Sequence, residues 1–206
     1  MPDLLRLGST SCLIVMVMMI ASVSVSVYSY DYEEFESRML RVIQAYYPDL
    51  FQMNPTRPVE IIRGIWGAWE QTGVDPWLLA AVCARENEFR NRPGAAGEVG
   101  YCQMMSETIR VVGRLLKIST APETFHLRVD LQFLFAGTWL QYNINNYGLL
   151  EGIARYNHTS HQDRYVQQVL RITAAFRYSD GEREWLFYND PSLFFSGPSG
   201  DDDHLM

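Results

Sequence analysis

Glu86 is the residue best suited to chemistry, because it ends an apolar run on a predicted helix. At the helical period its side chain shares one face with three apolar residues, Leu79, Val82 and Cys83. The carboxylate therefore continues a buried stripe instead of facing bulk water. Desolvation raises the pKa of a carboxyl group, which suits a general acid that works near neutral pH. We expect Glu86 to be a catalytic acid with a raised pKa.

The charged neighbours of Glu86 narrow its chemistry. Glu88 lies about 200° further round the helix, so the two carboxylates point to opposite sides. They cannot form the two-carboxylate site of ordinary glycosidases, and a reaction that rests on one acid is favoured. The structural alternative is a helix-end carboxylate that pairs with Arg85 or Arg90.

The loop that follows this helix contains Gly94, Gly97 and Gly100. Glycines let a backbone approach a phosphate closely. A dinucleotide-binding loop, however, follows a strand and opens a helix, whereas this loop follows a helix. We expect the glycines to shape a wall beside Glu86.

Cysteine and histidine spacing indicates no metal centre. His158 and His161 lie three residues apart, but no third ligand of fitting spacing follows, so no metal and no cofactor are expected. The three cysteines, Cys12, Cys83 and Cys102, form no metal-binding pair. Cys83 and Cys102 flank the glycine-containing loop, and a bridge between them requires close Cβ atoms. We expect two buried free thiols there, with a disulfide as the alternative.

Length and charge bound the organisation of the chain. Its 206 residues, 48% of them hydrophobic, suffice for one full core. The formal net charge of -7 and the lack of basic runs argue against nucleic-acid binding. Residues 12–27 carry no charge, which indicates a cleaved signal peptide or an uncleaved membrane anchor. We expect such a segment over residues 1–30, one domain over 31–180, and a C-terminal extension with an acidic tail over 181–206.

Periodicity and turn residues predict a helical domain. Pro48 is expected to break the first helix, and nothing alternates strongly enough to require more than a small hairpin within residues 88–104. The predicted helices span residues 30–47, 59–71, 77–86, 109–118, 127–147, 149–156 and 163–176.

Two of these helices carry further expectations. Asp75 and Pro76 suit the cap and the first turn of the helix that ends near Glu86. Residues 127–147 are apolar nearly all round, which predicts a central buried helix. Its Trp139 and Tyr142 are expected in the core.

Four motifs follow one another within residues 59–170. They are Glu86-Asn87-Glu88-Phe89, Gly100-Tyr101-Cys102-Gln103-Met104-Met105, Asp130 ahead of Ala136-Gly137-Thr138-Trp139-Leu140, and Tyr156-Asn157 followed by Tyr165. In this order the chain resembles the soluble-lytic-transglycosylase-like (SLT) domain of the lysozyme-like superfamily. It looks like a divergent member, because Asn87 stands where the family usually has serine and Tyr101-Cys102 replaces Leu-Met. The resemblance implies an all-α, lysozyme-like fold.

The resemblance also implies a reaction, the cleavage of the β-1,4 bond between N-acetylmuramic acid and N-acetylglucosamine in peptidoglycan. Glu86 would protonate the glycosidic oxygen and then act as base on the 6-hydroxyl of the muramic acid, which gives a 1,6-anhydro product. An internal nucleophile of this kind needs no second enzyme carboxylate. Tyr156 would orient Glu86. The implied substrate-binding residues are Asn87, Gln103, Met104, Tyr156 and Asn157.

Other interpretations stay open. Without the resemblance, Gln103 would be a turn amide and Tyr156 a core residue with a satisfied hydroxyl. The enzyme could be a hydrolytic muramidase that uses water, or the domain could be an inactive glycan-binding or assembly module. Expected partners are peptidoglycan strands, a membrane reached through the N-terminal segment, and proteins of an envelope-spanning secretion or conjugation machine or of a phage particle. The expected location is the cell envelope or periplasm, or the virion if a phage encodes the chain.

Overall fold

The computed structural model describes residues 30–157 and 162–178. The chain divides into two units, residues 1–31 and 32–206, and the second contains every helix that is described. The expected extension over 181–206 lies outside the described residues, and so does the expected leader apart from Tyr30. Within the described ranges, no helix combines the length and the apolar character needed to cross a membrane.

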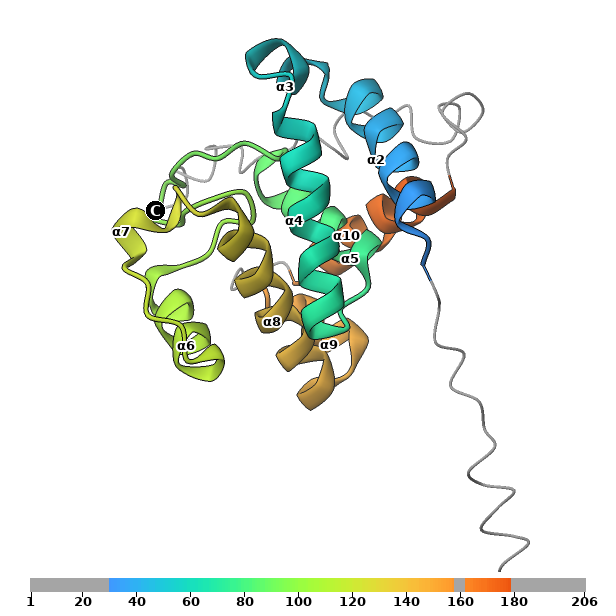
Figure 1. Ribbon diagram of the computed structural model, residues 1–206. Coiled ribbons are helices and arrows are strands. Elements are labelled where there is room, and N and C mark those ends of the chain that lie inside the picture. Colours follow the sequence, from blue (N-terminus) through green and yellow to red (C-terminus); the bar gives the residue numbers. More distant parts are fainter. Residues whose placement is uncertain (1–29, 158–161, 179–206) are drawn as a thin grey trace, which may run out of the picture. The chain divides into compact units, whose positions relative to one another are not determined.

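The described residues fold as an all-α domain, which confirms the expected class (Figure 1). The expected small hairpin is reduced to one isolated antiparallel bridge, between Val99 and Met104. The helices are α2 (Tyr32–Tyr46), α3 (Pro48–Met53), α4 (Arg57–Thr72), α5 (Pro76–Asn87), α6 (Ser106–Leu116), α7 (Pro122–Phe125), α8 (Val129–Tyr147), α9 (Leu149–Ala154) and α10 (Gln162–Tyr178).

Two short helices, α3 and α7, are absent from the sequence-based expectation. Each begins with a proline, Pro48 or Pro122. The first N–H groups of a helix have no acceptor within the helix, so a proline, which lacks an N–H, fits at this position. Proline can therefore start a helix as well as end one. Helix α2 ends at Tyr46, which confirms the break expected at Pro48, and Pro48 then opens α3.

The helix that carries Glu86, α5, begins where the cap residues predict. Oδ1 of Asp75 accepts hydrogen bonds from the N–H groups of Trp77 and Leu78 at 2.9 and 3.0 Å. These bonds satisfy donors that the first turn leaves without a partner. The helix ends because Glu88 adopts the left-handed region, with φ of 50°.

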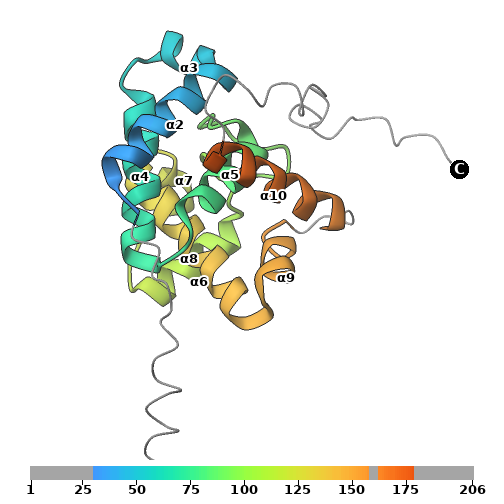
Figure 2. The ribbon, with the colours of Figure 1, turned by 90° about the vertical axis from the view of Figure 1, so that its right-hand side faces the viewer.

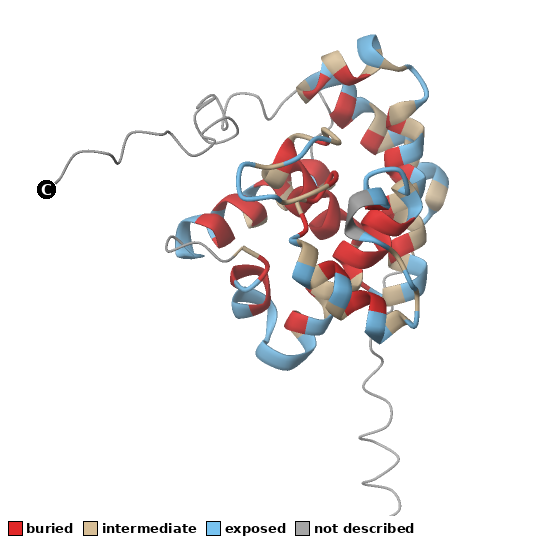
Figure 3. Ribbon diagram, turned by 90° about the vertical axis from the view of Figure 1, so that its left-hand side faces the viewer, coloured by how far each residue is buried: buried red, intermediate tan, exposed pale blue. Residues whose placement is uncertain are grey.

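Helix α8 lies at the centre of the domain, between α4, α6 and α9 (Figure 1). Residues 131–137, in its first half, are all buried, as the apolar sequence predicts. Helix α4 lies very close to this half, as Gly64 shows: a side chain at this position would clash with the ring of Phe133. Figure 3 shows that buried residues gather where the helices face one another.

The second half of α8 is buried on one side only. Leu140 is fully buried, whereas Tyr142, about 200° round the helix from it, is 42% exposed. Trp139 is partly buried and stacks on Tyr142, with ring centroids 5.7 Å apart. The expectation that both aromatic residues belong to the core is therefore wrong, because neighbouring helices cover only one side of α8 at this end.

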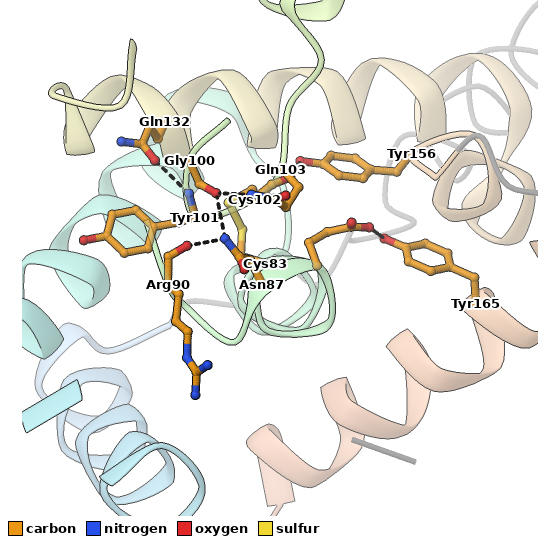
Figure 4. The surroundings of a disulfide bond; sticks show 11 residues. Cys83, Asn87, Arg90, Gly100, Tyr101, Cys102, Gln103, Gln132, Tyr156 and Tyr165 are labelled. Carbon is orange, nitrogen blue, oxygen red and sulfur yellow. Dashed lines mark hydrogen bonds between the residues drawn. A yellow bond between two sulfur atoms is a disulfide. The ribbon is translucent and has the colours of Figure 1, made fainter. Parts of the chain in front are cut away.

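Cys83 and Cys102 form a disulfide bond, so the expectation of two free thiols is wrong. Both residues are almost wholly buried. The bond ties α5, one turn before Glu86, to the loop between α5 and α6 (Figure 4). The pairing depends on how closely two distant segments approach, which is a property of the tertiary structure.

Loss of this disulfide is expected to destabilise the domain. In the double variant Cys83→Ala/Cys102→Ala, the unfolded chain regains the freedom that a bridge over 19 positions removes. The free energy of unfolding should fall by about 3 kcal/mol, measured by urea unfolding and circular dichroism. Reductant should weaken the native chain and leave the double variant unchanged. A native chain that unfolds at the same urea concentration with and without reductant would contradict this.

Candidate active site

Glu86 lies in the last turn of α5 and is partly exposed. The buried hydroxyl of Tyr165 donates a hydrogen bond of 2.6 Å to its Oε1. Burial raises the pKa of Glu86 to about 7, against the opposing effects of the Tyr165 hydrogen bond and the charge of Arg85, while the charge of Glu98 adds to the rise. The carboxyl group therefore carries a proton over much of the range up to neutral pH, as the apolar helix face predicts.

The pairing of α5 with α10 determines this geometry. The two helices run antiparallel, and α10 lies alongside α5 (Figure 2). At one end Arg177 forms an ion pair with Asp75, the cap of α5. At the other end Tyr165 meets Glu86. Since the helices are antiparallel, the start of α5 meets the end of α10, and the end of α5 meets the start of α10. The contacts at the two ends together hold the carboxyl group of Glu86 against the Tyr165 hydroxyl.

The tyrosine that contacts Glu86 differs from the expected one. Tyr156 is buried, and its hydroxyl donates to the backbone oxygen of Cys102 at 2.9 Å. It still lies near the acid, since burial and the charge of Glu86 both raise the pKa of Tyr156. Figure 4 shows Tyr156 and Tyr165 pointing toward the same region from different segments. Tyr165 orients the carboxyl group, and Tyr156 holds the opposite loop.

Asn87 holds the loop after α5 instead of facing an open groove. It is 6% exposed, and its Nδ2 donates to the backbone oxygen of Arg90. Its Oδ1 accepts a hydrogen bond of 2.9 Å from Nε of Arg92. The side chain therefore has its polar atoms engaged inside the protein, and the expected sugar contact has no support in this conformation.

Two further expected substrate contacts are also used within the loop. Nε2 of Gln103 donates to the backbone oxygens of Arg92 and Gly100, each at 2.9 Å, which matches the turn-amide alternative. Met104 is 4% exposed, and its backbone pairs with Val99. Asn157 follows Tyr156 in sequence and is partly exposed, as Gln103 is.

The loop is built from unusual backbone conformations. Glu88, Phe89 and Gln103 have φ of 50°, 54° and 49°, a region that side chains disfavour. Gly100 has φ of 84°, and a side chain there would clash with Oε1 of Gln132, which accepts the N–H of the next residue. Such conformations persist only where surrounding contacts over-determine them. Gly100 thus lets the loop backbone pass close to the side chain of Gln132.

Sequence reasoning missed a second carboxylate, Glu98. It is partly exposed, lies directly before the Val99 bridge, and interacts electrostatically with Glu86. Glu88 is engaged in another contact, since Arg90 pairs with Glu88 at 3.0 Å and with Asp49 at 3.1 Å. The only signal for Glu98 in the sequence was its position in the glycine-containing loop.

Metal binding finds no support in the part of the chain that is described. No group of three or more His, Cys, Asp or Glu side chains there could hold a metal ion. His158 and His161 lie outside the described residues.

The raised pKa of Glu86 should make stability depend on pH. Between its ordinary pKa and about 7, the unfolded chain releases this proton while the folded chain keeps it, so native stability falls as pH rises through this window. Glu86→Gln removes the effect and keeps an acceptor for Tyr165. As the pH rises from about 4 to about 8, the free energy of unfolding of the variant should increase relative to that of the native chain by up to about 3 kcal/mol, measured by urea unfolding. The exposed control Glu107→Gln should show no such trend, and equal trends in both variants would refute the assignment.

The two tyrosines should affect Glu86 differently. Tyr165→Phe removes a hydrogen bond that stabilises the charged carboxylate, so the pKa of Glu86 should rise above about 7. Tyr156→Phe removes a bond to a backbone oxygen and should leave that pKa nearly unchanged. Infrared difference spectra of the carboxyl band, titrated with pH, measure both. The same pKa in Tyr165→Phe as in the native chain would show that the bond does not act on the acid.

The arrangement as a whole can hold and donate one proton near neutral pH from a partly exposed position at the end of a buried helix. No protein-family model matches the chain, and a search of curated proteins finds no match.

Proposed function

We propose that this protein is a peptidoglycan lytic transglycosylase with an SLT-like, lysozyme-like domain, in which Glu86 acts as both acid and base. The observation that carries the proposal is the carboxyl group of Glu86, partly exposed, oriented by Tyr165 and with a pKa of about 7. It stands at the position where the resemblance requires the catalytic acid. A group that must give and regain a proton works best when its pKa lies near the working pH.

The geometry suggests how the two proton transfers are divided. Tyr165 donates a hydrogen bond to Oε1, so in this proposal the acidic proton of Glu86 lies on Oε2. Its proton passes to the glycosidic oxygen as the bond from that oxygen to C1 of the muramic acid breaks. The carboxylate that results is stabilised by the Tyr165 hydrogen bond. It then takes the proton of the 6-hydroxyl as that oxygen bonds to C1, which gives the 1,6-anhydro sugar and returns Glu86 to its acid form.

The disulfide supports a location in the cell envelope, secreted or tethered. Structural disulfides persist in oxidising compartments such as the periplasm and are rare in the cytosol. The bond between Cys83 and Cys102 is buried beside the proposed acid. Peptidoglycan strands would be the main partner, and a membrane, an envelope-spanning machine or virion proteins would position the activity.

A hydrolytic muramidase is the second candidate, and Glu98 is the observation that favours it. Its carboxylate interacts with Glu86 from the neighbouring loop. A second carboxylate of this kind can act as base on a water molecule, as inverting glycosidases do. In that case water replaces the 6-hydroxyl as nucleophile.

An inactive glycan-binding module is the third candidate. It is favoured by the burial of Asn87 and Met104, which leaves fewer side chains for sugar contacts.

Zymography and product masses separate these functions. Native protein should clear a purified-wall gel, whereas Glu86→Gln should lose at least about a hundredfold in activity, because a positioned acid contributes about that much. Glu107→Gln, on the exposed surface of α6, is the matched control and should keep full activity. Released muropeptides should end in 1,6-anhydro sugars.

Each other outcome points to a different function. A reducing end on every product, together with loss of activity in Glu98→Gln, would establish the muramidase. Absence of clearing by the native protein, with retained binding to the wall, would establish the binding module.

A further inference from the structure

Arg85 stands directly before Glu86 and reaches the other helix of the pair. Its Nε donates a hydrogen bond of 2.8 Å to Oε1 of Gln168 on α10. Gln168 lies one turn after Tyr165, so the contact is close to the one that orients the acid. Among the described residues, no carboxylate lies within ion-pair distance of Arg85. A neutral group therefore holds this guanidinium, and its charge acts on Glu86 without a closer carboxylate partner.

The choice of an amide at position 168 has no packing advantage. Gln168 is 4% exposed, and its Nε2 has no hydrogen-bond partner in the described part of the chain. An unsatisfied buried donor destabilises a fold, and methionine, which is of similar size, has no such donor. Glutamate would bind Arg85 more strongly, through a charge-assisted bond. Only the amide holds the guanidinium without neutralising it.

We propose that Gln168 is a positioning residue, which holds the Arg85 guanidinium beside Glu86 through a neutral acceptor and so keeps its full positive charge acting on the catalytic carboxyl group. The proposal deepens the proposed function and rests on it, because it explains how the acid is set for two opposite proton transfers.

The groups around Glu86 show why this charge matters. Burial and the charge of Glu98 favour the protonated form, and they raise the pKa. Tyr165 from α10 and Arg85 from α5 favour the carboxylate, and Tyr156 lies close without a hydrogen bond to the acid. A carboxyl group whose pKa is raised further becomes a weaker acid for the first step, because the carboxylate that it leaves behind is less stable. The charge of Arg85 limits that rise.

The test is a carbon NMR titration of the Glu86 carboxyl group in the full chain, with the signal assigned by its loss in Glu86→Gln. Gln168→Glu, Gln168→Met and Arg85→Gln should each raise the pKa of Glu86 by at least about half a unit, and Gln168→Glu should raise it most because it also adds a negative charge. Arg171→Gln is the matched control, since it removes the same charge from an exposed position on α10 and should change nothing.

A double-variant cycle decides whether Gln168 acts through Arg85. In the Arg85→Gln background, Gln168→Met should cause no further shift. A shift that persists without Arg85 overturns the proposal. So does an unchanged pKa in Gln168→Glu and Gln168→Met, whatever their thermal stability. A purely structural role would lower the melting temperature of Gln168→Met and leave the titration as it is in the native chain.

The titration needs no enzymatic activity, so its result is independent of the proposed reaction. Native protein that fails to clear wall would refute the proposed function, and the titration would still show whether Gln168 and Arg85 set the pKa of the acid. If the native protein is active, the basic limb of its pH profile should move to higher pH in Gln168→Glu, in parallel with the titration.

Discussion

The hydrogen bond from Tyr165 to Glu86 is the contact on which the site depends, because it joins residues 79 positions apart at the end of a buried helix. A carboxyl group at this place loses solvation, and the hydroxyl of Tyr165 recovers part of that loss for the charged form. Burial also raises the pKa of Tyr165 well above its ordinary value, so the hydroxyl remains a donor throughout. The rest of the domain holds these two groups together.

The antiparallel pairing of α5 and α10 makes that contact rigid. Asp75 contributes to this pairing through both carboxylate oxygens. One oxygen caps α5, and the other pairs with Arg177 near the end of α10. The helix start and the helix pairing are thereby fixed by the same side chain. A shift of α10 along α5 would break the ion pair, the Arg85–Gln168 bond and the Tyr165–Glu86 bond together.

The loop after α5 differs from the helix pair, because several of its residues have a strained backbone conformation. Consecutive left-handed residues at Glu88 and Phe89, and another at Gln103, cost conformational energy. Hydrogen bonds from Asn87 and Gln103, the Cys83–Cys102 bond and the contact of Tyr156 with the backbone of Cys102 hold the loop in place. Three of the residues expected to bind sugar, Asn87, Gln103 and Tyr156, thus hold this loop through their own hydrogen bonds.

Local sequence determined much of this protein. The helical periods, the Asp75 cap and the apolar face beneath Glu86 were all visible, because they depend on residues within a few turns of one another. The raised pKa of Glu86 followed from that face. The two short helices were missed, because a proline can begin a helix as well as end one.

Only the tertiary structure decided which distant groups meet Glu86. It brought Tyr165 to the carboxyl group instead of Tyr156, added Glu98 from the loop, joined Cys83 to Cys102, and placed Arg85 against Gln168. Each of these contacts depends on distance and direction between segments far apart in the chain. Periodicity and composition carry no information on such distances, so the sequence identified the acid and the fold supplied its surroundings.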